Sequence, residues 1–473
     1  MQEIIEKIAA IAKKKRQKVY IVGGFLRDSI MGKDTPDIDF VVFGDAMKFA
    51  ETVAIKLKGS FINLSKKFGF FRVVIKKENR IIRLDFAKSR GKTLSGDLNW
   101  RDFIINTLLA RVGSPDEIID KFGAIKDLDR KVIREVNNSI FKYDPLRILR
   151  AIRFSSDLKF RLSNNLKKLI KKDRFLLKRV SGERIRDELF KILEYDDCTG
   201  YIKLMDKLKI MEVLFPGIVP MKRIKQSDNH HLDVWNHSIE TVRLINDSIA
   251  IIEKLNKSLK DNIRKYVSEE ITKGRGRTEV IKFAALFHDI AKPEVRKIID
   301  GKVRFLRHES VGSKIIAKIG REFKLSKKEI KLLKILVLSH LRPGNLVHGE
   351  KITKRAVSRF IADLGNDVFG TVIISLADRL AARGKVVDSK IIERHIEIIK
   401  IILDSYQENL IISNLPKLIS GHDLMDKFCL TPGPLIGKIL NEVKKAQIAG
   451  KISTFSEAMR FAELLIRKKR GFK

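Results

Sequence analysis

YIVGGFLRD, residues 20–28, is an apolar run that ends in two glycines and then turns polar. We predict a strand up to Gly23-Gly24 and a helix after it, a junction that leaves backbone N–H groups free at the helix N-terminus. Glycine has no side chain, so a phosphate group can approach that backbone closely. Arg27 falls in the first turn of the predicted helix, where it can contact the same phosphates. The stretch therefore predicts a phosphate cradle near the start of an α+β unit.

Two carboxylates follow in TPDIDF, residues 35–40. Asp37 and Asp39 are two apart, so in a strand both side chains point the same way. Such a pair can bind two Mg²⁺ ions about 4 Å apart, which activates an attacking hydroxyl and stabilises a leaving pyrophosphate. RLDFA places Asp85 in a second apolar strand, where an acid is costly unless it is paired or bound to metal. An Asp pair on a strand face is often merely solvated, but the neighbouring glycines favour a catalytic site.

The pattern of apolar residues changes near residue 140. Before it, short apolar runs alternate with turns, which is typical of strands. The expected strands are KVYIVGG, DIDFVVFG, FRVVIKK and RIIRLDFA, at residues 18–24, 37–44, 71–77 and 80–87. After residue 140, apolar residues recur at helical spacing almost without interruption. The fold class that we predict is α+β, with a mixed head followed by helical units.

Charge and cysteine content restrict the possible partners and compartment. With 97 Lys and Arg against 58 Asp and Glu, the 473-residue chain carries a net charge of +39. A solvated lysine-rich surface can explain part of this excess, but its size favours nucleic acid as a partner. Two distant cysteines, Cys198 and Cys429, predict a reducing cytoplasm. No run reaches the ~18 apolar residues of a membrane span, so we expect no membrane partner.

Four further motifs follow the acids along the chain. They are NWRDFIINTLLA (99–110), DKFGAIKDLDRKVIR (120–134), YDPLRILRAIRF (143–154) and SGERIRDELFKIL (181–193). In this order they resemble the motifs of class II tRNA nucleotidyltransferases and bacterial poly(A) polymerases. The head of these enzymes is similar to that of DNA polymerase β. The resemblance covers about 190 residues and is highly specific.

The resemblance implies an activity and a role for each matched residue. The implied reaction is template-independent addition of C and/or A from CTP and ATP to the 3′ end of tRNA. The implied catalytic acids are Asp37, Asp39 and Asp85, of which Asp37 and Asp39 hold Mg²⁺. The implied nucleotide-binding residues are Gly23, Gly24, Arg27, Arg101, Asp102, Asn106, Asp144, Arg147, Arg150 and Arg153.

Asp144 and Arg147 are the residues that the resemblance assigns to base selection. They are three apart, so on one helix they share a face, where acceptors and a donor fork can match the edges of C and A. Asp before Pro is also a good helix N-cap, and Arg147, Arg150 and Arg153 can equally form a ridge that faces phosphates. Together with the other motifs, the base-selecting role is favoured.

The chain departs from the family pattern at several positions. Trp100 stands where the family often has an Arg, which indicates a lost phosphate contact or a stacking contact, and Tyr143 replaces an acid. Ile104 and Thr107 are expected to be packing changes. GKTLSG, residues 91–96, is shorter than the flexible loop of CCA-adding relatives. The enzyme can therefore be a CC-adding or A-adding specialist, with a poly(A) polymerase as the alternative.

A second set of residues lies in the helical region. His237, His288-Asp289 and Asp378 occur in the order H…HD…D, which resembles the HD phosphohydrolase superfamily, and His308 and His340 match the extra ligands of its two-metal members. His and Asp together suit a transition metal such as Mn, Fe, Ni or Zn. The resemblance implies metal-dependent phosphohydrolase or 2′,3′-cyclic phosphodiesterase activity. One alternative is a structural domain that extends the tRNA-binding surface. Another is a protein that acts as an HD-driven RNA-end hydrolase, with an inactive transferase head, and the intact pair Asp37 and Asp39 argues against it.

We therefore expect four units. Residues 1–138 form the nucleotidyltransferase head, and residues 139–220 form a helical neck and RNA-binding body with the base-selecting helix. Residues 221–385 form an all-helical HD domain, and residues 386–473 form a C-terminal helical section that binds tRNA.

Overall fold

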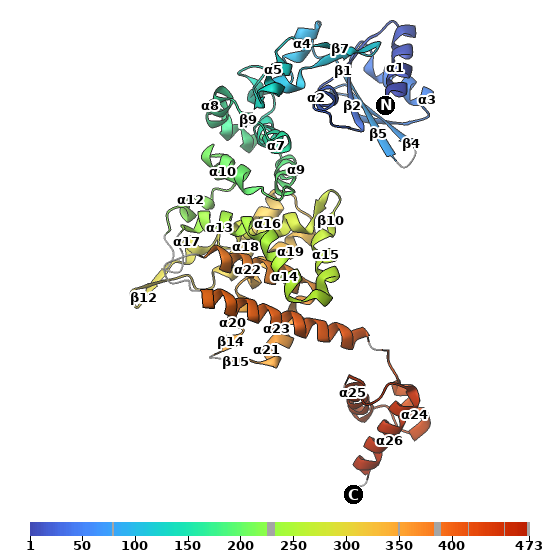
Figure 1. Cartoon of the computed structure of the whole chain (residues 1–473), viewed down its shortest axis with the longest axis vertical. Coiled ribbons are helices and arrows are strands. Elements are labelled where there is room, and N and C mark those ends of the chain that lie inside the picture. The colour runs from blue at the N-terminus through green and yellow to red at the C-terminus, as the bar shows by residue number, and fades with distance from the viewer. Residues whose placement is uncertain are drawn as a thin grey trace.

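The computed structural model describes residues 1–77, 80–224, 232–348, 351–382, 389–414, 416–448 and 450–470. The molecule is elongated, with the N-terminal head at one end and a small helical unit at the other (Figure 1). The predicted domain boundary at 385/386 lies outside the described residues. The other predicted boundaries stay predictions.

The head contains a seven-stranded mixed sheet in the order β3-β4-β5-β2-β1-β6-β7. Its strands are β1 Lys18–Val22, β2 Asp37–Phe43, β3 Ser60–Ser65, β4 Phe70–Lys77, β5 Arg80–Lys88, β6 Leu109–Arg111 and β7 Ser114–Ile119. The central pair β2 and β5 is parallel, and the other neighbours are antiparallel. The helices of the head are α1 Gln2–Lys14, α2 Gly24–Ile30, α3 Ala46–Lys56, α4 Leu94–Leu98 and α5 Ala124–Asp129.

The two faces of the sheet differ because side chains alternate along each strand. Ile38, Phe40 and Val42 of β2 are buried in the main core, together with residues of α1 and α3. Asp37 and Asp39 occupy the intervening positions and are solvent-accessible. Strand alternation thus presents the acids on the face opposite to the one that α1 and α3 cover.

The predicted fold class is confirmed, and four of the seven strands were expected. The missed strands are β3, which is mostly exposed, and the short pair β6 and β7. GAIKDLDRKVIR, residues 123–134, is expected from its pattern to form a turn and one more strand; it begins instead with helix α5, and the expected strand is present at its end. The two-residue strand β8, Val132–Ile133, follows and pairs in parallel with β9, Arg161–Leu162.

Short helices connect the head to the rest of the chain. They are α6 Ile140–Tyr143, α7 Arg147–Leu158, α8 Asn164–Asp173, α9 Gly182–Leu193, α10 Thr199–Lys207, α11 Ile210–Leu214 and α12 Ile218–Met221. The prediction that Asp144 and Arg147 share one helix is wrong. Asp144 has an extended backbone at the end of α6, and α7 begins at Arg147, because the intervening Pro145 favours an extended residue before it.

The region around the predicted second site is helical apart from small hairpins. Its helices are α13 Val234–Arg243, α14 Ile245–Leu255, α15 Lys260–Ser268, α16 Arg277–Phe287, α17 Lys292–Val295, α18 His308–Glu322, α19 Lys327–Ser339, α20 Arg342–Asn345, α21 Lys354–Leu364 and α22 Val368–Ala381. The hairpin strands are β10 Glu270–Thr272, β11 Arg275–Gly276, β12 Lys297–Ile299, β13 Lys302–Arg304, β14 Val347–His348 and β15 Lys351–Ile352. The predicted all-helical domain is therefore helical in its main elements, and the small hairpins were not predicted. Asp300-Gly301 between β12 and β13, both at positive φ, is a typical hairpin turn.

One described stretch, residues 354–381, is long and apolar enough by length and composition to span a membrane. In the fold it forms α21 and α22, separated by the 3-10 turn Gly365–Asp367. Its most apolar window is 72% buried inside the protein. Such burial is typical of core helices.

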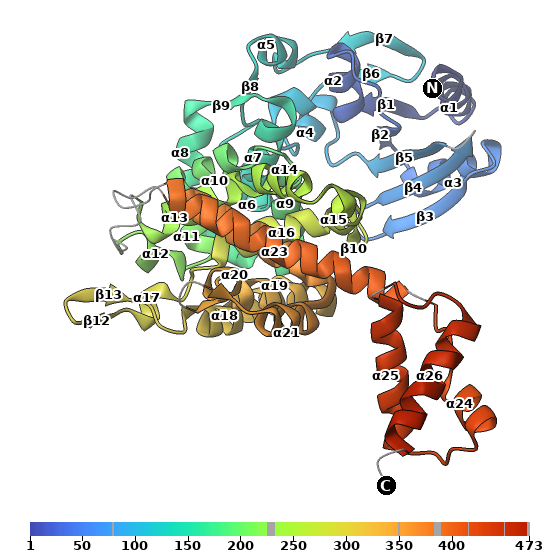
Figure 2. The ribbon, with the colours of Figure 1, turned by 60° about the horizontal axis from the view of Figure 1, so that its bottom comes forward.

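The C-terminal unit has a core of its own. The long helix α23, Ser389–Asn414, runs along the HD region and leads to α24 Gly421–Phe428, α25 Pro434–Ile448 and α26 Phe455–Arg470 (Figure 2). The hydrophobic cluster of this unit includes Leu424, Ile439 and Ala458. It is separate from the main core, which is continuous from the head to the HD region.

Candidate functional site

The three predicted acids lie on neighbouring parallel strands. In the register of β2 and β5, Asp39 is opposite Asp85, and Asp37 is opposite Arg83. The Asp39 side chain is accessible to solvent on one side, and protein atoms surround the rest of the carboxylate. This burial, together with the charge of Asp85, raises the pKa of Asp39 to about 6, although Arg101 partly offsets the effect. The site therefore carries negative charge that a cation would relieve.

Two arginines on the sheet partly balance that charge. Arg72 of β4 donates two hydrogen bonds to Asp85, from Nε to Oδ1 and from Nη2 to Oδ2, each 2.7 Å long. Arg83 donates from Nη1 to Asp37 Oδ1 at 3.3 Å. Sequence reasoning missed Arg72. Arg72 and Asp85 are opposite each other in the register of β4 and β5, which neither strand's sequence shows by itself.

The glycine turn lies next to the acids. Gly23 has a φ of +73°, and a Cβ atom there would lie 3.2 Å from Arg101 Nη1 and 3.7 Å from Asp39 Oδ2. The backbone conformation therefore favours glycine, and a larger residue would also displace the Arg101 guanidinium slightly. Gly24 begins α2, the helix that carries Arg27. The structure thus brings the turn, Asp39 and Arg101 together.

A buried polar chain connects the turn to the neck. Arg27 donates from Nη1 to Asn106 Oδ1 at 2.8 Å, and Asn106 donates from Nδ2 to Asp102 Oδ1 at 2.9 Å. Arg150 donates from Nη2 to Asp102 Oδ2 at 2.7 Å. Burial alone would raise the pKa of Asp102, but Arg150 and Asn106 outweigh it and hold the pKa at about 2. Four residues predicted to bind the nucleotide thus form one network.

A pocket of about 320 Å³ lies between head and neck. Its lining includes Arg90, Trp100, Asp144, Arg147, Arg150 and Arg184. Arg153, by contrast, is not among the lining residues. It donates from Nε to Glu188 and from Nη1 to Asp157, each at 2.7 Å. Arg153 thus supports the packing of α7 on α9, away from the pocket.

The two residues expected to select the base both face this pocket. Arg147 donates to the carbonyl oxygens of Trp100 and Arg101. Asp144 accepts from the Leu146 amide at 3.2 Å and from Arg184 Nη2 at 2.9 Å. Asp144 therefore caps the turn into α7 and also borders the pocket, and its role in base selection stays a prediction. Arg184 was missed, although it lies in the quoted SGERIRDELFKIL motif.

The short GKTLSG segment is tightly packed. Thr93 caps α4 by accepting from the Gly96 amide at 3.1 Å. Asp97 accepts from the Arg90 amide at 2.9 Å. A Cβ atom at Gly91 would lie 2.5 Å from the Gly96 carbonyl carbon, so glycine is required there. The segment is a compact capped turn beside the pocket.

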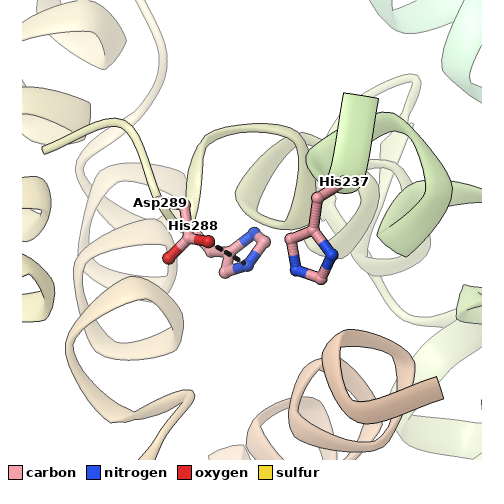
Figure 3. Close-up of side chains that lie close together, drawn as sticks. All are labelled: His237, His288 and Asp289. Atoms are coloured by element: carbon pink, nitrogen blue, oxygen red, sulfur yellow. Dashed lines mark ion pairs between the residues drawn. The ribbon is translucent and has the colours of Figure 1, made fainter. Parts of the chain in front are cut away.

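The six residues predicted for the second site converge from distant parts of the chain. His237 lies on α13, His288 and Asp289 directly follow α16, and Figure 3 shows these three side chains together. His308 begins α18, His340 directly follows α19, and Asp378 lies on α22. His237 Nε2 lies 2.8 Å from Asp378 Oδ1. Asp289 contacts His288 Nε2 at 3.3 Å through Oδ2 and His308 Nε2 at 3.2 Å through Oδ1.

Three of these histidines are oriented by the backbone. The Nδ1 atoms of His288, His308 and His340 lie 2.7, 2.8 and 2.7 Å from the carbonyl oxygens of Ala285, Phe305 and Val337. A carbonyl can only accept, so each Nδ1 carries a hydrogen and each Nε2 faces the site, where the neutral ring offers a lone pair to a metal.

The donor set fits a divalent metal. The six side chains form three overlapping groups of three, and within each group the ligand atoms lie within 4.8 Å of one another. Asp289 belongs to two of these groups, so it can be shared between two ions. Neutral imidazole and carboxylate donors are typical of transition-metal sites.

Lys292 is a further residue at this site that sequence reasoning missed. Its Nζ lies 2.5 Å from Asp289 Oδ2. Lys292 lies three residues after Asp289, at the start of α17.

The two aspartates also affect His288. Burial would lower the pKa of His288, but Asp289 and Asp378 outweigh it and raise that pKa to about 10.

Four family models match the chain. They are the poly A polymerase head domain at residues 19–134, the probable RNA and SrmB-binding site of polymerase A at 159–221, the HD domain at 234–383, and the putative tRNA nucleotidyltransferase domain 2 at 387–462.

Similar proteins extend over nearly the whole chain. The A-adding tRNA nucleotidyltransferase of Deinococcus radiodurans is 27% identical over 94% of this chain and 94% of the relative. The CC-adding tRNA nucleotidyltransferase of Thermus thermophilus is 28% identical over 93% of this chain and 92% of the relative. The structure of the Thermotoga maritima CCA-adding enzyme complexed with tRNA has a TM-score of 0.60 at 23% identity, covering 98% of this chain and 95% of that one.

Fold and sites together define a polymerase-β-like nucleotidyltransferase head joined through a helical neck to an HD domain. The chain carries a poly A polymerase head domain, an HD domain and a putative tRNA nucleotidyltransferase domain 2, and the relatives that match nearly its whole length are named tRNA nucleotidyltransferases.

Proposed function

We propose that this protein adds C and/or A nucleotides from CTP and ATP to the 3′ end of tRNA without a nucleic-acid template. The observation that carries the proposal is the placement of Asp39 opposite Asp85 and beside the Gly23 turn. Relatives of similar identity are named A-adding and CC-adding, so overall identity does not choose between these specificities. The free thiols of Cys198 and Cys429 are consistent with work in a reducing cytoplasm.

Each part of the head has a role in this proposal. Asp37 and Asp39 supply hard oxygen donors, which suit Mg²⁺. The bound ion would lower the pKa of the attacking 3′-hydroxyl and neutralise charge on the leaving pyrophosphate. The turn at Gly23-Gly24 exposes backbone to the triphosphate, and Arg27 stands beside it with its guanidinium fixed by Asn106.

Base selection is assigned to Asp144 and Arg147. The carboxylate of Asp144 supplies acceptors to the pocket, and the buried Arg147 supplies a donor fork. Because Arg184 holds Asp144 Oδ2 at 2.9 Å, a base that bonds to this oxygen shares or replaces that contact. The neck thereby fixes the residue that reads the base.

Replacement of Asp144 by Ala tests this assignment. We expect kcat/KM for the preferred nucleotide to fall about 10- to 100-fold relative to GTP and UTP, since a two-point hydrogen-bonded contact is worth ~1–3 kcal/mol of discrimination. Steady-state incorporation with each single nucleotide measures the ratio. Asp129→Ala, an exposed acid at the end of α5, is the matched control. Unchanged discrimination in Asp144→Ala would leave Asp144 as a helix cap only.

We also propose that the HD domain is a metal-dependent phosphohydrolase acting on RNA 3′ ends, with 2′,3′-cyclic phosphates as the substrate class. Its support is the convergence of four histidines and two aspartates on one buried site. A bound divalent ion would polarise the phosphate and activate water. Lys292 holds Asp289 from the side, which orients this carboxylate toward the histidines.

The experiment for the leading proposal uses three tRNA transcripts, which end before CCA, after C and after CC. Each is incubated with Mg²⁺ and one nucleotide at a time, and the products are sequenced. A CC-adding enzyme extends only the first two with CTP, an A-adding enzyme extends only the third with ATP, and a CCA-adding enzyme extends all three. No incorporation on any transcript would refute the proposal.

A further inference from the structure

Two departures from the family motifs, Trp100 and Tyr143, are in contact with each other. Their ring centroids are 4.5 Å apart, with an angle of 41° between the planes. They come from different motifs, 43 residues apart, and the fold brings them together at the junction of head and neck. Trp100 is 40% exposed and Tyr143 is 48% exposed. Exposed adjoining aromatic rings are typical of binding surfaces.

Trp100 borders the pocket that Asp144 and Arg147 also line. Tyr143 is not among the residues that line the pocket, and its ring contacts the indole of Trp100. The Arg90 guanidinium lies 5.9 Å from the indole centroid and 5.7 Å from the ring of Phe70. The pocket thus has an aromatic wall with a cation beside it.

The chain couples this wall to the two residues that read the base edge. Tyr143 directly precedes Asp144, and the carbonyl oxygen of Trp100 accepts a hydrogen bond from Arg147 Nη2. A nucleobase that bonds through its edge to Asp144 and Arg147 presents its flat face to a neighbouring wall of the pocket. Trp100 lines the pocket together with Asp144 and Arg147, and its backbone contacts Arg147.

We propose that Trp100, supported by Tyr143, stacks on the base of the incoming nucleotide. This inference rests on the proposed nucleotidyltransferase function. It makes Trp100 a nucleotide-binding residue whose contact does not depend on which base edge is presented, because every base has a π face.

Nucleotide binding without RNA tests the stacking directly. The chain has two tryptophans, and Trp235 is fully buried in the HD domain. Quenching of tryptophan emission by CTP or ATP in the full-length protein therefore reports on Trp100. We expect quenching by the preferred nucleotide and none by inorganic tripolyphosphate.

Variants give the second readout, the affinity by equilibrium dialysis. We expect Trp100→Ala to weaken nucleotide binding about 5- to 100-fold and to leave tripolyphosphate binding unchanged, whereas Trp100→Phe stays within about threefold of the native protein. Phe175→Ala, an exposed aromatic next to Arg174 in the neck, is the control and is expected to bind normally.

Three results would overturn the inference. The first is the same nucleotide affinity in Trp100→Ala as in the native protein, and the second is a loss of tripolyphosphate affinity as large as the loss of nucleotide affinity. The third comes from steady-state incorporation: a change in the KM for tRNA without a change in the KM for the nucleotide would show that the ring contacts the RNA end. Because the binding titrations contain no RNA, they are separate from nucleotide transfer. Normal quenching without incorporation into any tRNA would refute the proposed function and leave the stacking contact in place.

Discussion

Replacement of Asp39 by Asn is expected to reduce nucleotide incorporation by at least about a thousandfold, or ~4 kcal/mol of transition-state stabilisation. Asn is nearly the same size but cannot supply the charge that holds a divalent ion. Single-turnover incorporation with saturating tRNA, nucleotide and Mg²⁺ measures the loss. Under these conditions the change in rate reports on the chemical step rather than on binding.

The fold is expected to survive this substitution. The pKa of Asp39 is raised from 3.8 to about 6, so its ionised form is disfavoured in the folded protein. Ionisation therefore opposes folding as the pH rises above the unfolded value, and an amide removes that opposition. The melting temperature of Asp39→Asn at pH 8 without Mg²⁺ is expected to equal or exceed that of the native protein.

Asp34→Asn is the matched control. Asp34 is an exposed acid in the segment that leads from α2 to β2, and it pairs with Arg80 at 3.6 Å. This variant is expected to keep native activity. Incorporation by Asp39→Asn within tenfold of the native rate would contradict the assignment of Asp39 as a metal-binding catalytic residue.

The double replacement His288→Ala and Asp289→Ala is expected to remove the HD metal and reduce phosphohydrolase activity by about a thousandfold or more. Each of the three groups that can hold an ion contains His288, Asp289 or both, so the double replacement affects every one of them. The measurements are metal content by mass spectrometry and hydrolysis of an RNA with a 2′,3′-cyclic phosphate. Nucleotide incorporation is expected to persist, since the head does not share these residues.

His422→Ala, an exposed histidine in α24, is the control for the general effect of losing an imidazole. His340→Ala provides a milder variant, because it leaves His237, His288 and Asp289 as one intact group. Cyclic-phosphate hydrolysis that continues unchanged in the double variant, with the metal lost, would show that this site does not catalyse it. The domain would then be structural.

The sequence was sufficient for the parts of the fold that local patterns determine. Alternation in DIDFVVF predicts both the strand β2 and the shared face of Asp37 and Asp39. The edge strand β3 was missed because most of its side chains are exposed, so it shows no apolar alternation. At Asp144 the helical spacing was misleading, because Pro145 separates α6 from α7.

In the candidate sites too, the residues were predictable from the sequence, but their contacts with distant residues were not. Motif order identified six residues of the HD site, and the structure brings all six together. The pairing of Arg72 with Asp85 and of Arg184 with Asp144 depends on strand register and on packing between helices distant in sequence. Periodicity along one segment cannot encode such contacts. The contact of Trp100 with Tyr143 likewise joins two motifs that sequence reasoning treated separately.

The most direct test of the central claim is the number of nucleotides added to a tRNA transcript without its CCA end, compared with an unrelated RNA of equal length. Both are incubated with CTP, ATP and Mg²⁺, and the 3′ ends are sequenced. We predict that the tRNA gains at most three nucleotides, all of them C or A, and that the unrelated RNA gains none. A parallel reaction with a transcript already ending in CC covers an A-adding specialist, which would extend only that transcript. Long A tails on both RNAs, or no addition to any tRNA end, would contradict the account.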